Sequence, residues 1–195
     1  MSPSPAQDAV EAALGLVDGA FPRCGDTLVV AVDGRSGTGK TTYAAQLADR
    51  LDAPVVHLDD IYPGWDGLEA AVTAVARDVL EPLAAGAPAA YTRWDWMRDR
   101  PGSVVPVPPT AFLVLEGVGA GAEPAGRWAS VLLWLTADDE VRKERAIRRD
   151  GEVFARQWDR WAAHEQRLLG RDHTPQRATL VLDTTDWAED GVGDE

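Results

Sequence analysis

The chain has 195 residues, of which 45% are hydrophobic, and a formal net charge of −13. This length suits one domain with a full apolar core, and the acidic balance argues against nucleic-acid or anionic-membrane partners, which need a basic surface. The single cysteine excludes an intrachain disulfide. Because we find neither a signal peptide nor an apolar run of membrane-spanning length, we expect a cytoplasmic protein.

The first elements of the chain surround a glycine-rich motif. An amphipathic pattern over residues 6–17 predicts a helix, and the apolar run 28–32 predicts a strand that is buried on both faces. Residues 34–41 read Gly-Arg-Ser-Gly-Thr-Gly-Lys-Thr and fit the phosphate-binding loop pattern G-x-x-x-x-G-K-[ST]. Apolar residues at helical spacing over 44–51 predict the helix that should follow. Strand, loop and helix come in the required order, which predicts a nucleoside triphosphate site.

The residue types in this loop suit a triphosphate. Gly34, Gly37 and Gly39 allow close approach of backbone N–H groups to phosphate oxygens, and the helix start adds partial positive charge. Lys40 is expected to reach the β- and γ-phosphates, and the Thr41 hydroxyl to ligate Mg²⁺. A glycine-rich turn with an incidental lysine is the alternative. The predicted nucleotide-binding residues of the loop are Gly34, Ser36, Gly37, Thr38, Gly39, Lys40, Thr41 and Thr42.

A pair of acids follows the second predicted strand, residues 54–58. Ligands of open α/β sheets bind beyond the carboxyl ends of the strands. Asp59 is therefore expected to face the γ-phosphate, where it can accept a proton from an attacking hydroxyl or hold Mg²⁺ through water. Alternatively, Asp59 and Asp60 only cap the next loop. His57 lies inside the strand and is expected to be packed rather than catalytic.

The middle of the chain combines a long helix with an aromatic segment. Residues 67–86 predict the helix, which Pro82 should end or kink. Residues 91–100 interleave aromatic and charged side chains, which can stack on a ring and hydrogen-bond its edges. Residues 101–109 are proline-rich and should return the chain to the sheet. We interpret 91–109 as a substrate-side insertion; a hairpin with solvated charges is the alternative for 91–100.

The next predicted strand covers residues 112–117 and carries Glu116 near its end. An apolar strand that ends in a carboxylate has the form of the second P-loop motif, whose acid supports Mg²⁺. A strand over 131–135 leads to a helix with an acidic first turn. This helix carries five basic residues within eight positions, and three arginines share one face, namely Arg142, Arg145 and Arg149. In so acidic a chain we interpret them as a clamp for the transferring phosphate; a solvated helix paired with glutamates is the alternative.

The last part of the chain completes the predicted sheet. Asp150-Gly151 marks a break, and residues 153–169 predict another helix, whose tryptophans and His164 are expected to pack. Residues 137–170 thus form a predicted lid region. The last strand is expected over 179–182, followed by an acidic tail, 184–195.

Four matched places within residues 34–150 resemble the uridine kinase-like branch of P-loop nucleoside and nucleotide kinases. They are the loop 34–42, Asp59-Asp60-Ile61-Tyr62, Trp94-Asp95-Trp96, and Leu115-Glu116-Gly117 followed by the arginine helix 140–150. The resemblance implies a three-layer α/β/α fold with a five-stranded parallel sheet, similar to nucleoside monophosphate kinases, with a lid helix and a substrate-side hairpin. The sequence departs from the family at the histidine that reads a pyrimidine edge, which is here Asp99 or a neighbour.

The resemblance also implies roles for individual residues. Asp59 would be the base toward the substrate hydroxyl, and Thr41, Asp59 and Glu116 would serve Mg²⁺. The other predicted catalytic residues are Lys40, Arg145 and Arg149, with Arg142 on the nucleotide phosphates. The predicted substrate-binding residues are Tyr62, Tyr91, Arg93, Trp94, Asp95 and Arg98.

These patterns predict one P-loop kinase domain, 1–195, with ATP and Mg²⁺ as cofactors and a small-molecule acceptor. We expect it to phosphorylate a hydroxyl of a small, nucleoside-like metabolite. Another hydroxylated metabolite or a nucleoside monophosphate is the alternative acceptor, and a regulatory NTPase is the alternative class. The chain contains no asparagine, so the Asn-Lys-x-Asp guanine-reading motif is absent. A homo-oligomer is left open.

Overall fold

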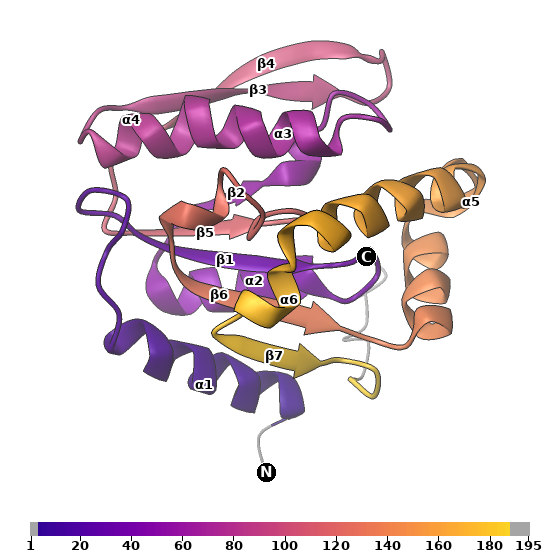
Figure 1. Ribbon diagram of the computed structural model, residues 1–195, viewed down its shortest axis with the longest axis horizontal. Helices are drawn as coiled ribbons and strands as arrows, with labels where there is room; N and C mark the ends of the chain where they lie inside the picture. The colour runs from indigo at the N-terminus through magenta and orange to yellow at the C-terminus, as the bar shows by residue number, and fades with distance from the viewer. Residues whose placement is uncertain (1–3, 188–195) are drawn as a thin grey trace, which may run out of the picture.

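The computed structural model describes residues 4–187, and its centre is a parallel sheet of five strands (Figure 1). The strand order is β2-β5-β1-β6-β7, with each neighbouring pair parallel. The strands are β1 (Leu28–Gly34), β2 (Val55–His57), β5 (Phe112–Glu116), β6 (Ala129–Thr136) and β7 (Leu180–Asp183). All residues of β1 are buried, as its continuous apolar run predicts. The predicted five-stranded parallel sheet is confirmed.

Helices cover both faces of the sheet because successive strand residues point to opposite sides. Val30 and Val32 pack on the side of α1 (Pro5–Asp18) and α2 (Lys40–Leu51). Val29 and Ala31 pack on the side of α3 (Leu68–Val75) and of the second half of α5 (Asp139–Asp172). The result is the predicted three-layer α/β/α arrangement (Figure 1).

The long helix predicted over 67–86 is continuous but not uniform. After α3 come a π-helical turn, Ala76–Leu80, and α4 (Glu81–Ala84). The irregular turn ends at Leu80, two positions before Pro82, which cannot donate a backbone hydrogen bond. The helix therefore passes through Pro82 and ends at Ala84.

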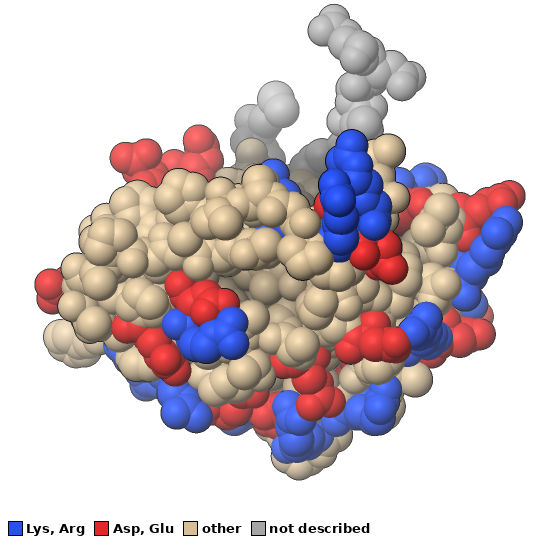
Figure 2. All heavy atoms as spheres, turned by 90° about the horizontal axis from the view of Figure 1, so that it is seen from above, with Lys and Arg blue, Asp and Glu red and all other residues tan. Residues whose placement is uncertain are grey.

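The aromatic segment folds as an antiparallel hairpin of β3 (Ala89–Asp95) and β4 (Arg100–Val107), which forms its own two-stranded sheet beside α3 (Figure 1). The hairpin interpretation of 91–100 is therefore correct for its backbone. On the face seen in Figure 2, acidic and basic side chains are interspersed around a large uncharged area.

The predicted lid is formed by α5, which contains a sharp break at Gly151 (φ 69°, ψ −157°). The break separates a first arm, 139–150, from a second arm, 152–172, which turns back across the carboxyl ends of the strands (Figure 1). The short α6 (Thr174–Arg177) then leads into β7. Of the predicted acidic tail 184–195, residues 188–195 lie outside the described part. Within residues 4–187, no helix combines the length and apolarity needed to cross a membrane.

Candidate active site

The glycine-rich loop connects β1 to α2 at the carboxyl edge of the sheet, as predicted. Gly37 and Gly39 have positive φ angles of 83° and 81°, which favour glycine. A Cβ atom on Gly37 would lie 1.8 Å from the carbonyl oxygen of Arg142, so the first arm of α5 packs directly on the loop. Lys40 is buried, with 7% of the residue exposed, and its ammonium group donates to the Arg35 carbonyl at 3.0 Å. The loop is thus closely covered by the lid.

Asp33, the residue before the motif, anchors this loop to the segment after β5. Its carboxylate accepts hydrogen bonds from the backbone N–H groups of Gly34 (2.7 Å), Gly119 and Gly121 (both 2.9 Å). Complete burial raises the pKa of Asp33 to about 6, against the lowering effect of these donors. Sequence reasoning missed Asp33, although a lone acid in an apolar strand could have indicated a structural role.

The predicted acids lie at neighbouring strand ends. Glu116 ends β5 and places Oε1 3.4 Å from the Thr41 hydroxyl, while its Oε2 lies 2.7 Å from Nδ1 of His57. This contact is the main cause that raises the pKa of His57, which is therefore not simply a packed residue. Asp59 lies in the turn after β2 with its side chain open to the pocket, and desolvation by the surrounding pocket walls, reinforced by the charge of Glu116, raises its pKa.

The residues predicted to serve Mg²⁺ supply oxygen ligands of the type this ion prefers. Thr41 and Glu116 are in contact, and Thr41 and Asp59 line one pocket. Within residues 4–187, no group of three or more His, Cys, Asp or Glu side chains is arranged as a metal site by itself. A magnesium ion here would therefore combine these few protein oxygens with those of bound phosphates and water.

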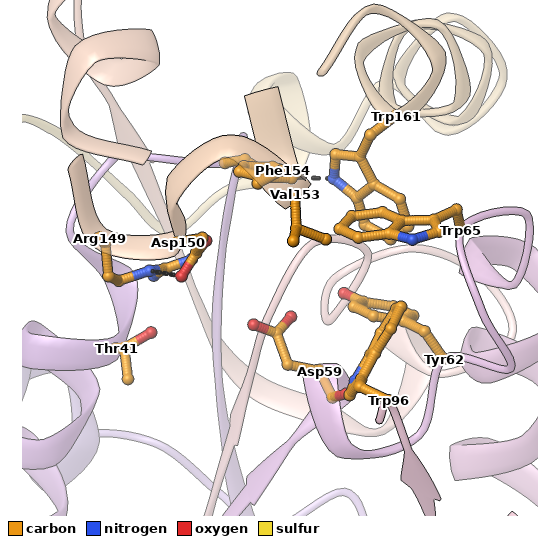
Figure 3. Close-up of a pocket in the computed structure, with 11 residues that line it drawn as sticks. Thr41, Asp59, Tyr62, Trp65, Trp96, Arg149, Asp150, Val153, Phe154 and Trp161 are labelled. Atoms are coloured by element: carbon orange, nitrogen blue, oxygen red, sulfur yellow. Dashed lines mark hydrogen bonds and ion pairs between the residues drawn. The ribbon is translucent and has the colours of Figure 1, made fainter. Parts of the chain in front are cut away.

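A pocket of about 580 Å³ opens beside Asp59. Figure 3 shows Thr41, Arg149 and Asp150 on one side of Asp59, and Tyr62, Trp65, Trp96 and Trp161 on the other. The pocket joins the loop, the turn after β2, the hairpin and both arms of α5. Its lining residues are Ser36, Thr41, Asp59, Tyr62, Trp65, Trp96, Arg149, Asp150, Val153, Phe154 and Trp161.

The three predicted lid arginines occupy different places. Arg149 lines the pocket and forms a two-bond ion pair with Asp150, at 2.7 and 2.8 Å. Arg142 is buried over the Trp158 ring, 5.1 Å from its centroid. Arg145 donates to backbone carbonyls of residues 184, 185 and 187, each at 3.0 Å. Arg149 thus lies at the pocket, while phosphate roles for Arg142 and Arg145 stay predictions.

The second arm of α5 is fastened to the glycine-rich loop by two residues that sequence reasoning missed as site residues. Glu165 is fully buried, and its carboxylate accepts from the Ser36 N–H at 2.8 Å and from Arg35 Nε at 3.0 Å. One turn earlier, the indole N–H of Trp161 donates to Ser36 Oγ at 2.9 Å. Their i, i+4 spacing places both on one helix face. We had expected Trp161 only to pack.

The predicted substrate-side residues divide into one that lines the pocket and several that do not. Tyr62 lines it and donates its hydroxyl proton to the Val118 carbonyl at 2.8 Å. The hairpin reaches the pocket through Trp96, whose indole N–H donates to the Asp59 carbonyl at 2.9 Å. The predicted residues Tyr91, Arg93, Trp94, Asp95 and Arg98 are not among the lining residues. Tyr91 and Arg93 contact Asp60, and Asp95 pairs with Arg98.

Comparison with known proteins agrees with this geometry at the level of the fold. No family model matches the chain, and no curated protein matches its sequence. Solved structures do match, and together with the loop and sheet they place the chain among proteins with the P-loop kinase fold.

Within that class the fold is uridine kinase-like, as the motifs indicated. A possible uridine kinase from Bacillus stearothermophilus superposes with a TM-score of 0.58 and 19% identity, over 88% of this chain and 100% of that one. A candidate fructose transport system kinase from Silicibacter sp. TM1040 gives a TM-score of 0.58 and 18% identity, over 93% of this chain and 100% of that one.

Proposed function

We propose that the protein is an ATP- and Mg²⁺-dependent phosphotransferase that transfers a phosphoryl group to a hydroxyl of a small molecule. The observation that carries this proposal is a single pocket bounded by both Thr41 of the phosphate loop and Asp59. A triphosphate held by the loop and a hydroxyl in the pocket would meet at Asp59. The similar solved structures are named as uridine and fructose-system kinases, which agrees with an alcohol acceptor.

In the proposed reaction, the acceptor oxygen forms a bond to the γ-phosphorus and the bond to the β–γ bridging oxygen breaks. Asp59 accepts the hydroxyl proton, and its raised pKa favours this task. Backbone N–H groups of residues 34–41 and Lys40 hold the phosphates, and Arg149 faces the developing charge. Mg²⁺, held by Thr41 and Glu116, would neutralise charge on the β- and γ-phosphates.

The lid supplies the remaining requirement, a site shielded from water. We propose that residues 1–195 act as one kinase domain, with 91–109 on the acceptor side and 137–170 as the lid. Both arms of α5 contact the loop, through Arg142 and Glu165. Exclusion of water would limit hydrolysis of the triphosphate when no acceptor is present.

The test measures ADP release with MgATP alone and with a panel of nucleosides, nucleotides and sugar alcohols. We expect slow hydrolysis without acceptor and fast turnover with the right acceptor. Lys40→Ala should reduce turnover about 100-fold or more, because one charge-stabilising donor is lost. Lys143→Ala is the matched control, since this exposed lysine of α5 lies over the Trp158 ring outside the pocket. Normal MgATP binding and turnover in Lys40→Ala would overturn the proposal.

A further inference from the structure

The half of the pocket beyond Asp59 is built almost entirely of aromatic rings (Figure 3). Trp65 is at its centre, with ring centroids 5.0 Å from Trp96, 5.5 Å from Phe154 and 6.3 Å from Trp161. Trp161 in turn lies 4.9 Å from Tyr62. Rings from three separate segments, namely the connection between β2 and α3, the hairpin and the second arm of α5, converge on one space, which indicates a built binding surface.

Three of the four polar ring atoms are already engaged, and the indole N–H of Trp65 is the one ring donor without a hydrogen bond among the described residues. The Trp96 N–H donates to the Asp59 carbonyl, the Trp161 N–H to Ser36 Oγ, and the Tyr62 hydroxyl to the Val118 carbonyl. A nucleobase edge or a row of sugar hydroxyls placed against these three rings would lose hydrogen bonds to water and regain none from them. Such an unpaired buried polar group is unfavourable. Because Trp65 offers only one free ring donor, the aromatic half favours a body that is largely apolar.

The charged groups of the pocket lie in its other half (Figure 3). Arg149 is the one cation among the lining residues, and it is paired with Asp150. The aromatic half presents no cation to a phosphate or carboxylate on the acceptor. Charge therefore opposes an anionic acceptor such as a nucleoside monophosphate.

We propose that the acceptor is an amphipathic alcohol, with its hydroxyl directed at Asp59 and a flat apolar ring seated among Trp65, Trp96 and Phe154. Aromatic rings stack favourably on such a body, and they do so best when it is itself aromatic. This inference rests on the proposed phosphotransferase function and narrows its acceptor. It departs from the nucleoside-like acceptor that the sequence resemblance implies.

Binding and transfer are measured separately to test the acceptor class. The probes are 2-phenylethanol, 2-naphthaleneethanol and cyclohexylmethanol as apolar alcohols, with uridine, sorbitol and uridine monophosphate for comparison. Binding in the presence of MgADP is followed by tryptophan fluorescence and calorimetry, because three lining residues are tryptophans. Transfer is followed by ADP release with MgATP.

Three variants connect the result to the aromatic half. Trp96→Ala should weaken binding of the aryl alcohols about tenfold, and Trp96→Phe should recover most of the loss by keeping a ring. Neither should change MgATP affinity. Met97→Ala is the matched control, since the neighbouring Met97 is 97% exposed and outside the pocket lining. We expect it to bind the aryl alcohols like the unaltered protein.

Each outcome decides the inference. Tighter binding of apolar alcohols than of uridine or sorbitol, sensitive to Trp96→Ala, supports it. If they bind in this way and no probe is phosphorylated, the aromatic half binds apolar alcohols, but the inference that they are the acceptors is overturned. If uridine, sorbitol or uridine monophosphate is the better substrate, the inference is overturned while the phosphotransferase proposal stands. Absence of binding by all three apolar alcohols overturns it as well.

Discussion

The hydrogen bonds between Glu165, in the second arm of α5, and the phosphate loop give the most direct test of how this fold positions the candidate active site. The fully buried carboxylate of Glu165 accepts from the Ser36 N–H and from Arg35 Nε. The Nη1 atom of Arg142 lies 3.9 Å away and has no hydrogen-bond partner among the described residues. Glu165→Ala would leave these three donor groups without their shared carboxylate.

The expected cost follows from the burial of these groups. A hydrogen bond to a charged group contributes about 1.5–3 kcal/mol, and removing one partner of a buried ion pair costs about 3–5 kcal/mol. Because the two estimates describe the same contacts, we expect Glu165→Ala to lower the free energy of unfolding by about 3–5 kcal/mol. For a chain of this size, this corresponds to a fall in Tm of roughly 10 °C. Glu165→Gln keeps an acceptor for Ser36 and should cost about 1–3 kcal/mol.

Urea unfolding and MgATP affinity should be measured on the same variants. Because Ser36 belongs to the loop, Glu165→Ala should also weaken MgATP binding, which a purely peripheral role would not change. Glu152→Ala is the control on the same arm, since Glu152 forms an exposed i, i+4 pair with Arg156 at 3.2 Å. Glu152→Ala should lower the free energy of unfolding by less than about 0.5 kcal/mol. If Glu165→Ala unfolds at the urea midpoint of the unaltered protein, the reasoning about these hydrogen bonds is refuted.

Four further predictions concern other parts of the molecule. Because desolvation within the pocket raises the pKa of Asp59, and the base must be ionised, kcat/KM should rise with pH through a midpoint above about 4; a midpoint at or below 4 contradicts this. Gly37→Ala should displace the lid and lower kcat/KM at least about tenfold, since the added Cβ meets the Arg142 carbonyl. Gly170→Ala, which meets no atom within 4 Å in a helix, should be neutral or stabilising by up to about 1 kcal/mol in urea unfolding. Burial raises the pKa of the Cys24 thiol to about 11, so iodoacetamide should label it only in denaturant, as mass spectrometry can check; rapid native labelling would contradict its burial.

The parts of the fold that the sequence predicts are those with local signals. The runs 28–32, 112–115 and 131–135 are continuously apolar, because strands covered by helices on both faces have no solvent side. The glycine-rich loop is likewise contained in eight consecutive residues. Once β1, β2 and β5 end at one edge, topology brings Thr41, Asp59 and Glu116 near each other, and their roles follow from general chemistry.

The hairpin shows why the acceptor side was harder to predict. Alternation along a strand normally identifies which side chains share a face, but the pairing of β3 with β4 shifts register between Thr92 and Trp94. Beyond the shift, Asp95 lies opposite Arg100 and its side chain pairs with Arg98, while Trp96 reaches the pocket. A one-residue irregularity of this kind leaves no reliable trace in composition.

Trp161 shows what only the folded chain can combine. Its indole N–H holds Ser36 of the phosphate loop, 125 positions earlier in the chain, while its ring forms part of the wall of the acceptor pocket. A ring displaced by an acceptor would therefore pull on the loop, and a loop rearranged by a triphosphate would move the ring. Any change in MgATP affinity caused by the acceptor must be matched by an equal change in acceptor affinity caused by MgATP. Because Trp161 contacts both the loop and the pocket, Trp161→Phe, which keeps a ring and loses the N–H, should weaken this coupling more than it weakens the binding of either ligand alone.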